Sequence, residues 1–434
     1  MKLPPDLPLC PSLWRETASP APAPVKLSRS EAADIAIIGA GFTGLSAALS
    51  AIEHGLSAIV LEASEVGWGA SGRNGGVVST KYRVSLSEIA ARHGVETARQ
   101  MYRIGLDAVQ CVEDNLQKYG IGDADFARTG NLRCAHNARA LAKLVHEAET
   151  ARVNFGDTGL IALDAATVRH ETGSSDYVGG VLTTHGGIIH PLNYARGLAA
   201  AVRRGGGAIF ERSPVLSTAR EGDRTIVNTP EGQVAARYVI LATDGYSDIT
   251  QATAAVRKTV IPFRSAILAT APLDPDLLAT VMRTGRSYSE TRRMMRWFRP
   301  WGSRMLFGGR GAFGREDTKA AFDALETAMK KTFPQLEDVR ITHRWSGLVS
   351  MTLNSLPQVG KLDRHAGFAL GYNGAGIAMS SLMGRRVVDL LVGGTPELGL
   401  MRRDRPAQIP LYSFRAPAVR VVAGVYQFLD RVGL

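Results

Sequence analysis

Residues 35–62 read IAIIGAGFTGLSAALSAIEHGLSAIVLE, and this stretch decides the fold. Residues 35–38 are continuously apolar, as in a strand of a parallel sheet that is buried on both faces. Apolar residues then recur with the spacing of one helix face, at Leu45, Ala48, Leu49 and Ile52. A further apolar run, SAIVLE, occupies residues 57–62. The stretch therefore predicts a strand, a helix and a second, parallel strand, which is the βαβ unit of doubly wound α/β proteins.

The turn between the first strand and the helix fits the pattern GxGxxG, with Gly39, Gly41 and Gly44. In such a turn the first glycine allows a tight bend, the second leaves room for a pyrophosphate, and the third lets helix and strand pack closely. The free N–H groups at the helix N-terminus attract the phosphates. Glu62 ends the second strand, where a carboxylate can bind ribose hydroxyls. A glycine-rich turn without a ligand is the alternative for the motif alone. The combination predicts a dinucleotide site without deciding between FAD and NAD.

A second glycine-dense segment, GWGASGRNGG at residues 67–76, follows where a nicotinamide dehydrogenase would begin another crossover helix. Its backbone N–H groups and the Ser71 hydroxyl can lie close to a bulky planar ligand. The alternative is a flexible surface loop. The segment favours a flavin over a nicotinamide cofactor.

The composition is that of a globular protein: of 434 residues, 45% are hydrophobic and 21% are charged. The formal net charge is +11, but the basic residues form no continuous run, and we expect no nucleic-acid partner. Three scattered cysteines, Cys10, Cys111 and Cys134, argue against a disulfide scaffold and against a metal site. The sequence has no apolar stretch of about 18 residues and no signal-peptide core, so we expect a cytoplasmic protein without a transmembrane segment.

Several segments together resemble the FAD-dependent glycine and D-amino-acid oxidase family. They are IIGAGFTGLSAA, VLEASEVGWGASGRNGG, the segment around Pro214 and Val215, VILATDGYS at residues 239–247, RWSGLVSMTLNSLPQVGKL at residues 344–362, and GYNGAGIAMSSLMGR at residues 371–385. The resemblance spans residues 34 to about 392. SLWRETA near the N-terminus and the RWSG block are similar to the gamma-glutamylputrescine oxidase subgroup.

The resemblance implies an α/β fold in which an FAD-binding Rossmann-like domain carries an inserted α+β substrate domain with a mostly antiparallel sheet. The discontinuous FAD-binding domain is expected at residues 33–82, 150–255 and 343–400, and the substrate domain at residues 83–149 and 256–342. Residues 1–32 are rich in proline and are expected to form an extended arm. Residues 401–434 would be a C-terminal extension.

The resemblance also implies which residues hold the cofactor. The expected FAD-binding residues are Gly39, Gly41, Phe42, Thr43, Gly44, Glu62, Ala63, Gly69, Ala70, Ser71, Gly72, Asn74, Gly75, Gly76, Val215, Ala242, Thr243, Gly245, Tyr246, Gly347, Gly371, Gly374, Ala375, Gly376, Ile377 and Ala378.

The implied chemistry is a two-electron oxidation next to nitrogen. A small amine or amino acid would pass its α-hydride to the flavin and leave an imine, which hydrolyses to an aldehyde or an oxo acid. The N–H groups of residues 374–378 would stabilise negative charge on the reduced ring. No residue could be assigned to proton transfer.

Three features of relatives are missing from this chain. Sarcosine oxidases attach their flavin through a cysteine in the C-terminal half, and this chain has no cysteine after Cys134, so we expect noncovalent FAD. Those enzymes also use a lysine in the reaction with oxygen, and residues 283–310 contain none, so oxygen and another carrier both remain as electron acceptors. Family members often have histidine where this chain has Ala375.

An arginine-rich stretch, residues 283–310, is expected in the sheet that covers the flavin. A guanidinium group can bind a substrate carboxylate bidentately, and Arg296 and Arg299 are the candidates, although most arginines of a strand point to solvent. Tyr372, like Tyr246, could form an aromatic wall for the substrate or simply pack. His190 could be an acid–base residue, but a single histidine is more often structural.

Two alternatives to an independent amine oxidoreductase remain. The chain could be a flavoprotein subunit of a heteromeric amine or opine oxidase, with the arm and the basic surface as interfaces. It could also be an NAD(P)-linked dehydrogenase, against which the segments 67–76 and 374–378 argue.

Overall fold

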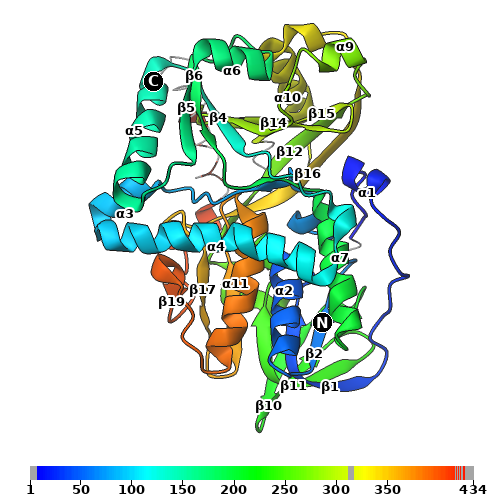
Figure 1. The fold of residues 1–434 in the computed structure, drawn as a ribbon. Helices are drawn as coiled ribbons and strands as arrows, with labels where there is room; N and C mark the ends of the chain where they lie inside the picture. Colours follow the sequence, from blue (N-terminus) through cyan, green and yellow to red (C-terminus); the bar gives the residue numbers. More distant parts are fainter. Residues whose placement is uncertain are drawn as a thin grey trace.

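Two large β-sheets form the frame of this computed structural model, which describes residues 7–310 and 317–415 and a few positions from 417 to 425 (Figure 1). The first sheet has nine strands, seven of them in the order β19-β17-β18-β11-β1-β2-β8. The second sheet has eight strands in the order β16-β12-β15-β14-β13-β4-β6-β5. A small ribbon of β3 (Val77–Val78) and β7 (Gly187–Ile188) completes the set among the described residues.

The first sheet contains the predicted βαβ unit. β1 (Ser30–Ile38) pairs in parallel with β2 (Ala58–Leu61) and with β11 (Gln233–Leu241). The remaining strands are β8 (Ala208–Phe210), β9 (Ser217–Glu221), β10 (Arg224–Asn228), β17 (Gln358–Lys361), β18 (Ala366–Leu370) and β19 (Arg402–Arg403). β1 begins inside residues 1–32, the segment expected to be an extended arm, because residues 30–32 pair with residues 233–235 of β11.

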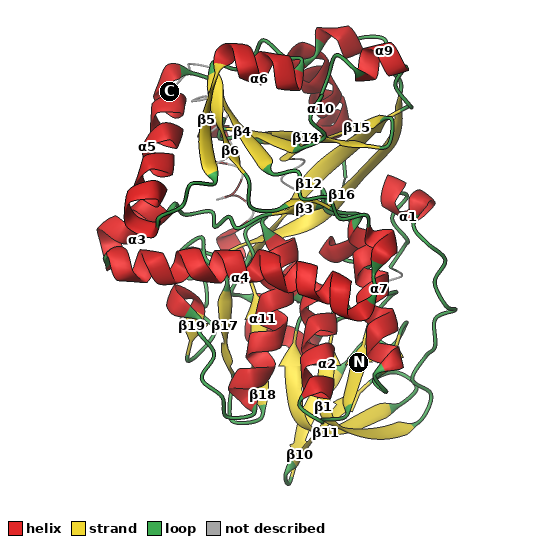
Figure 2. Ribbon diagram, viewed as in Figure 1, coloured by secondary structure: helices red, strands yellow, loops and turns green. Residues whose placement is uncertain are grey.

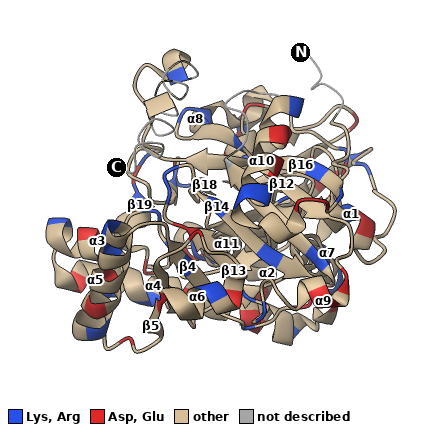
Figure 3. Ribbon diagram, turned by 90° about the horizontal axis from the view of Figure 1, so that it is seen from above, with Lys and Arg blue, Asp and Glu red and all other residues tan. Residues whose placement is uncertain are grey.

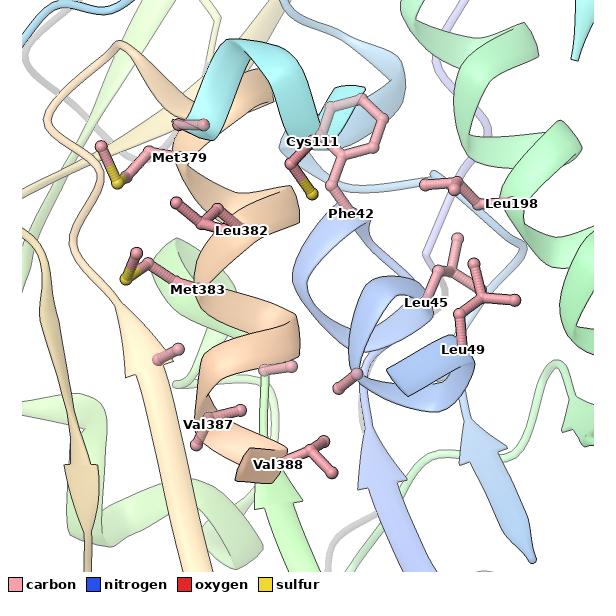
Figure 4. Packing of buried hydrophobic residues seen from close by; sticks show 14 of the residues in the cluster. Phe42, Leu45, Leu49, Cys111, Leu198, Met379, Leu382, Met383, Val387 and Val388 are labelled. Carbon is pink, nitrogen blue, oxygen red and sulfur yellow. The ribbon is translucent and has the colours of Figure 1, made fainter. Parts of the chain in front are cut away.

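Three helices, α2 (Phe42–Glu53), α7 (Pro191–Arg204) and α11 (Gly376–Leu391), cover one face of the first sheet, and a fourth, α4 (Val95–Tyr119), crosses over α11 and α7 (Figure 2). Figure 4 shows Leu45 and Leu49 of α2 in the same buried cluster as Met379 and Met383 of α11. α2 and α11 approach so closely that a Cβ atom on Gly384 would lie 2.2 Å from the Thr43 carbonyl oxygen.

The second sheet is mostly antiparallel, and only β13 and β4 pair in parallel. Its strands are β4 (Asn131–Ala135), β5 (Leu160–Asp164), β6 (Gly179–Thr183), β12 (Ile261–Thr270), β13 (Ser287–Glu290), β14 (Arg296–Trp301), β15 (Arg304–Arg310) and β16 (Ile341–Met351). The outer face packs Phe298 and Phe307 against Phe322 and Met329 of α10 (Lys319–Thr332). The predicted fold class, an FAD-type α/β domain with a mostly antiparallel second sheet, is confirmed.

The strand membership differs from the expected domain boundaries. β5 and β6 come from the range 150–255 that we assigned to the FAD-binding domain, yet both belong to the second sheet. Most of β16 comes from the range 343–400 and also belongs to the second sheet. Pairing with β4 and β12 decides these positions, and such contacts between distant segments leave no local pattern.

The remaining helices surround these sheets. They are α1 (Leu13–Thr17), α3 (Leu86–His93), α5 (Ala138–Phe155), α6 (Ala165–Thr172), α8 (Ala254–Arg257) and α9 (Pro275–Leu278). Gly94 has φ +87° and separates α3 from α4. Acidic and basic positions are interspersed along α5 (Figure 3). No helix among the described residues is long and apolar enough to cross a bilayer.

Candidate active site

A cavity of about 710 Å³ lies between the two sheets. Its floor is formed where β1, β2 and β11 end, and the carboxyl ends of parallel strands are the usual ligand site of such a sheet. Its roof is formed by the second sheet, including residues of β12, β13 and β14. Both glycine segments therefore face one cavity, together with the segment before α11.

The GxGxxG turn has the geometry that its sequence predicts. Gly39 has φ +109°, and a Cβ atom there would lie 2.9 Å from the Ala242 carbonyl oxygen. A Cβ atom on Gly44 would lie 1.9 Å from the Gly39 carbonyl oxygen, so helix and strand can pack only around a glycine. The N-cap of α2, Gly41, supplies no side-chain hydrogen bond. The Phe42 N–H group at the start of α2 donates to Ser71 Oγ at 3.0 Å, and the positive end of the helix dipole faces the cavity.

Glu62 lies beside this turn and is half-buried. One carboxylate oxygen accepts a hydrogen bond from the Ala40 N–H group at 2.8 Å, and the other accepts one from Ser64 N–H at 3.0 Å. Burial raises the pKa of Glu62, and the two N–H groups act in the opposite direction. Each oxygen keeps a free lone pair, which suits the hydroxyl donors of a ribose.

The carbonyl groups of the loop 67–76 are bound from outside the cavity by two indoles. Trp345 Nε1 donates to the Arg73 carbonyl at 2.9 Å, and Trp14 Nε1 donates to the Asn74 carbonyl at 2.7 Å. Both tryptophans are buried, and Trp14 comes from the N-terminal arm, where it lies in α1. The arm is therefore part of the support of this loop and not a loose extension.

A buried guanidinium continues the same pattern. Arg299 Nη1 donates to the carbonyl oxygens of Gly76 at 2.7 Å, Gly75 at 3.2 Å and Ile189 at 3.0 Å. Burial lowers the pKa of Arg299 to about 9. Within the described part of the chain, the N–H groups of Asn74 and Gly75 have no acceptor. With its carbonyls bound from behind, the loop can offer these N–H groups to a ligand.

The segment before α11 supplies a second open helix N-terminus. Gly374 has φ +92°, and the N-cap of α11, Ala375, makes no side-chain hydrogen bond. The Tyr372 hydroxyl lies 2.7 Å from Thr43 Oγ1 and so joins this segment to the N-terminus of α2. Two uncapped helix N-termini at one cavity form a strong site for negatively charged groups.

Most of the residues expected to bind FAD line this cavity. They are Gly39, Gly41, Phe42, Thr43, Glu62, Ala63, Gly69, Ala70, Ser71, Asn74, Gly75, Val215, Ala242, Thr243, Tyr246, Gly347, Gly374, Ala375, Gly376 and Ile377. The others lie just behind the lining and are Gly44, Gly72, Gly76, Gly245, Gly371 and Ala378. The glycines of this second group allow close packing; a Cβ atom on Gly72, for example, would lie 2.3 Å from the Gly67 carbonyl oxygen.

Arg296 and Arg299 do not line the cavity, although we expected them to bind a substrate carboxylate. Arg296 Nε donates to the buried carboxylate of Glu290 at 2.7 Å, and its Nη1 lies 3.0 Å from Thr332 Oγ1. Arg299 is committed to backbone carbonyls. The structure gives both guanidinium groups partners within the protein, and the expected role in substrate binding has no support in this arrangement.

His190 has the geometry of a structural histidine. Its Nδ1 accepts a hydrogen bond from the Asn193 N–H group at 3.1 Å and thereby caps α7. Its Nε2 lies 3.1 Å from Thr17 Oγ1 in the arm. Burial lowers the pKa of His190 to about 4, so the imidazole is neutral at neutral pH.

The cavity also contains side chains that the sequence did not single out. Lys81, Arg133, Ser289 and Trp297 line its upper part. β4 has the sequence NLRCA, and Arg133 is its half-buried residue between buried neighbours. An arginine inside such a short strand was the signal from which the sequence could have identified it as a candidate site residue. The direction in which it points follows from the register of the second sheet.

The sequence matches the family described as FAD dependent oxidoreductase over residues 34–390. The chain belongs to this family. It is 34% identical over 416 residues to gamma-glutamylputrescine oxidoreductase of Escherichia coli, which covers 94% of this chain and 95% of that protein. It is 32% identical over 408 residues to a probable oxidoreductase, OrdL, of Haemophilus influenzae, covering 93% and 94% of the two chains.

The fold of this FAD-dependent oxidoreductase is shared with solved structures. The crystal structure of glycine oxidase from Geobacillus kaustophilus matches with a TM-score of 0.71 at 19% identity, over 84% of this chain and 96% of that chain. The predicted enzyme class and cofactor are confirmed: the protein is an FAD-dependent amine or amino-acid oxidoreductase. The cavity fits FAD, since open N–H groups, a ribose-binding carboxylate and a glycine-rich loop meet there.

Proposed function

We propose that this enzyme oxidises the C–N bond of a small amine that bears a primary or secondary amino group. The observation that carries the proposal is the single cavity in which the two open helix N-termini and the loop 67–76 face the polar roof of the second sheet. When bound, FAD supplies the acceptor for a hydride from the carbon next to nitrogen. The resulting imine hydrolyses in water to an aldehyde or an oxo acid.

The residues of this chain would bind and orient the two reactants. Glu62 would hold the ribose, the N-terminus of α2 the pyrophosphate, and the N-terminus of α11 the negative charge that develops on the ring. The N–H groups of Asn74 and Gly75 would fix the ring from the side of the loop. Trp297 lies in contact with Gly75, since a Cβ atom there would be 2.5 Å from its indole, and so it would exclude water at the ring.

The FAD would be held without a covalent bond. Cys10, Cys111 and Cys134 are free thiols, and none of them lines the cavity. The 34% identity to a gamma-glutamylputrescine oxidoreductase favours an acylated diamine as substrate, oxidised at its free amino group.

Anaerobic reduction of the flavin tests the proposal. The purified holoenzyme is mixed with putrescine, an N-acylated putrescine, glycine and sarcosine, and bleaching of the flavin band is followed by stopped flow. Bleaching by an acylated diamine supports the proposed function, and absence of bleaching by any amine contradicts it. Bleaching that appears only after a second polypeptide is added would instead support a subunit of a heteromeric oxidase. Reoxidation of the bleached enzyme in air then identifies oxygen, or excludes it, as acceptor.

A further inference from the structure

A row of residues crosses the cavity face of the second sheet. Arg133 of β4 is the register partner of Ser289 in β13, Ser289 that of Trp297 in β14, and Trp297 that of Gly308 in β15. Directly paired residues of neighbouring strands point to the same face of a sheet. Gly308 leaves room for the indole, because a Cβ atom there would lie 2.1 Å from Trp297. The row therefore runs from Gly75, in the loop 67–76 that we call the flavin loop, to Arg133.

Arg133 is a half-buried cation for which the described residues provide no partner. Its guanidinium lines the cavity, and the described residues provide it with no hydrogen bond and no ion pair. Burial lowers its pKa, and the Glu147 carboxylate acts in the opposite direction without forming a salt bridge with it. Other arginines of the lining have acceptors: Arg92 pairs with Glu88, and Arg292 with Glu290. An unpaired buried charge is costly unless a ligand compensates it.

Lys81 lies next to this guanidinium. It follows β3 and the flavin loop in the chain, and its Nζ atom is 3.4 Å from Ser289 Oγ, the register partner of Arg133. Burial lowers the pKa of Lys81 to about 7, and the neighbouring positive charge of Arg133 contributes to the shift. No carboxylate of the described residues forms an ion pair with it. Two cations thus share one desolvated corner of the cavity.

We propose that Arg133 and Lys81 form a binding site for a substrate carboxylate that is remote from the oxidised amino group. A carboxylate placed between them would satisfy both cations, and the planar guanidinium can bind it bidentately. The proposal rests on the proposed function only in placing the reacting amino group at the flavin loop.

The distance across the sheet sets the length of the substrate. Neighbouring strands lie about 4.8 Å apart, so Arg133, two strands from Trp297, lies about 10 Å from it. An extended chain advances about 1.2 Å per bond, so about eight bonds separate the amino group from the carboxylate. An α-amino acid is too short to reach both ends, whereas an ω-amino acid or an acylated diamine with a terminal carboxylate can do so.

A length and charge series tests the site. The holoenzyme is assayed with ω-amino acids from 4-aminobutanoate to 10-aminodecanoate, with octylamine and with the amide of 8-aminooctanoate. We expect kcat/KM to be greatest near 8-aminooctanoate and about 10- to 100-fold higher than for octylamine or the amide, the range of a charge-assisted hydrogen bond. Arg133→Gln should remove this preference, so that kcat/KM becomes similar for the acid, the amide and octylamine. Lys81→Met should reduce the preference in the same direction.

Binding is also measured without turnover, by calorimetric titration of the holoenzyme with octanoate. We expect Arg133→Gln to weaken octanoate binding about 10- to 100-fold. Arg139→Gln on α5 is the matched control for Arg133→Gln, because it removes the same charge from an exposed position. If Arg133→Gln does not yield folded holoenzyme, Arg133→Lys replaces it and should give an intermediate loss.

Several results would overturn the site. One is equal octanoate affinity in Arg133→Gln and Arg139→Gln, and another is a loss of kcat/KM in Arg133→Gln that is the same for acid, amide and alkylamine. A third result concerns Lys81→Met: the variant keeps the preference for the acid, but its reduced flavin is reoxidised more slowly by oxygen. That result would assign Lys81 to the transfer of electrons from the flavin to oxygen. Failure of every amine to bleach the flavin would contradict the proposed function, while the octanoate titration would still decide on the carboxylate site.

Discussion

Replacement of Arg299 by methionine should weaken FAD binding on the order of 100-fold without changing the preference of the enzyme for acidic or neutral amines. Arg299 is fully buried, and its Nη1 atom holds the carbonyl oxygens of Gly75 and Gly76. A hydrogen bond from a charged donor contributes about 1.5–3 kcal/mol, so the two contacts together stabilise the loop conformation by about 3 kcal/mol. A free-energy difference of that size corresponds to on the order of 100-fold in a dissociation constant.

The measurement is a titration of apoprotein with FAD, followed by quenching of flavin fluorescence, together with thermal unfolding at saturating FAD. Arg296→Met is the comparison variant, because it also removes an arginine of β14, half-buried in this case, but breaks a contact to Glu290 and not to the flavin loop. We expect both variants to unfold at lower temperature and only the Arg299 variant to lose FAD affinity. Equal FAD affinity in Arg299→Met and wild type would refute the loop support. A selective loss of acidic substrates in Arg299→Met would instead return this residue to the substrate site.

Three further predictions concern the N-terminal arm, the GxGxxG turn and the dependence of stability on pH. Trp14→Phe keeps the buried ring but leaves the Asn74 carbonyl without its donor, and it should raise the dissociation constant of FAD about 5- to 10-fold, for a loss of about 1 kcal/mol, in the same titration. Gly41→Val should give folded protein without flavin, since its side chain would take the place of the pyrophosphate; a variant that purifies with full FAD content would contradict the turn. His190 has a folded pKa of about 4, below the 6.5 of the free side chain, so the unfolded state binds more protons between these values. Stability should therefore be complete above pH 6.5 and fall by about 3 kcal/mol towards pH 4, and His190→Asn, which can still cap the helix, should lose less in urea unfolding over this range.

Much of the cofactor site could be predicted from sequence because its signals are local. Gly39, Gly41 and Glu62 lie within one βαβ unit, and each glycine answers a steric need of the turn itself. The loop 67–76 follows directly, so its place at the cavity was predictable from chain order. The resemblance to the family extended the prediction to the segment before α11, which is distant in sequence.

The substrate side could not be predicted in the same way. Residues 283–310 were expected to provide a carboxylate ligand, but Arg296 pairs with Glu290, and Arg299 binds carbonyls that come from residues 75, 76 and 189. Composition shows that arginines are abundant in a strand and does not show which acceptor each one meets. The free guanidinium, Arg133, lies in another strand that was not singled out at all.

By itself, the sequence determined the dinucleotide-binding unit, because short-range spacing and glycine geometry are preserved within about thirty residues. The loop 67–76 and the resemblance of several segments to a known family indicated the class of cofactor and the class of enzyme. Only the tertiary structure decided which side chains face the substrate. A strand presents alternate residues to opposite faces, and the phase of that alternation is set by the partners that cover each face. For Arg133 and Trp297 these partners are β13 and the flavin loop, brought together from segments more than a hundred residues apart.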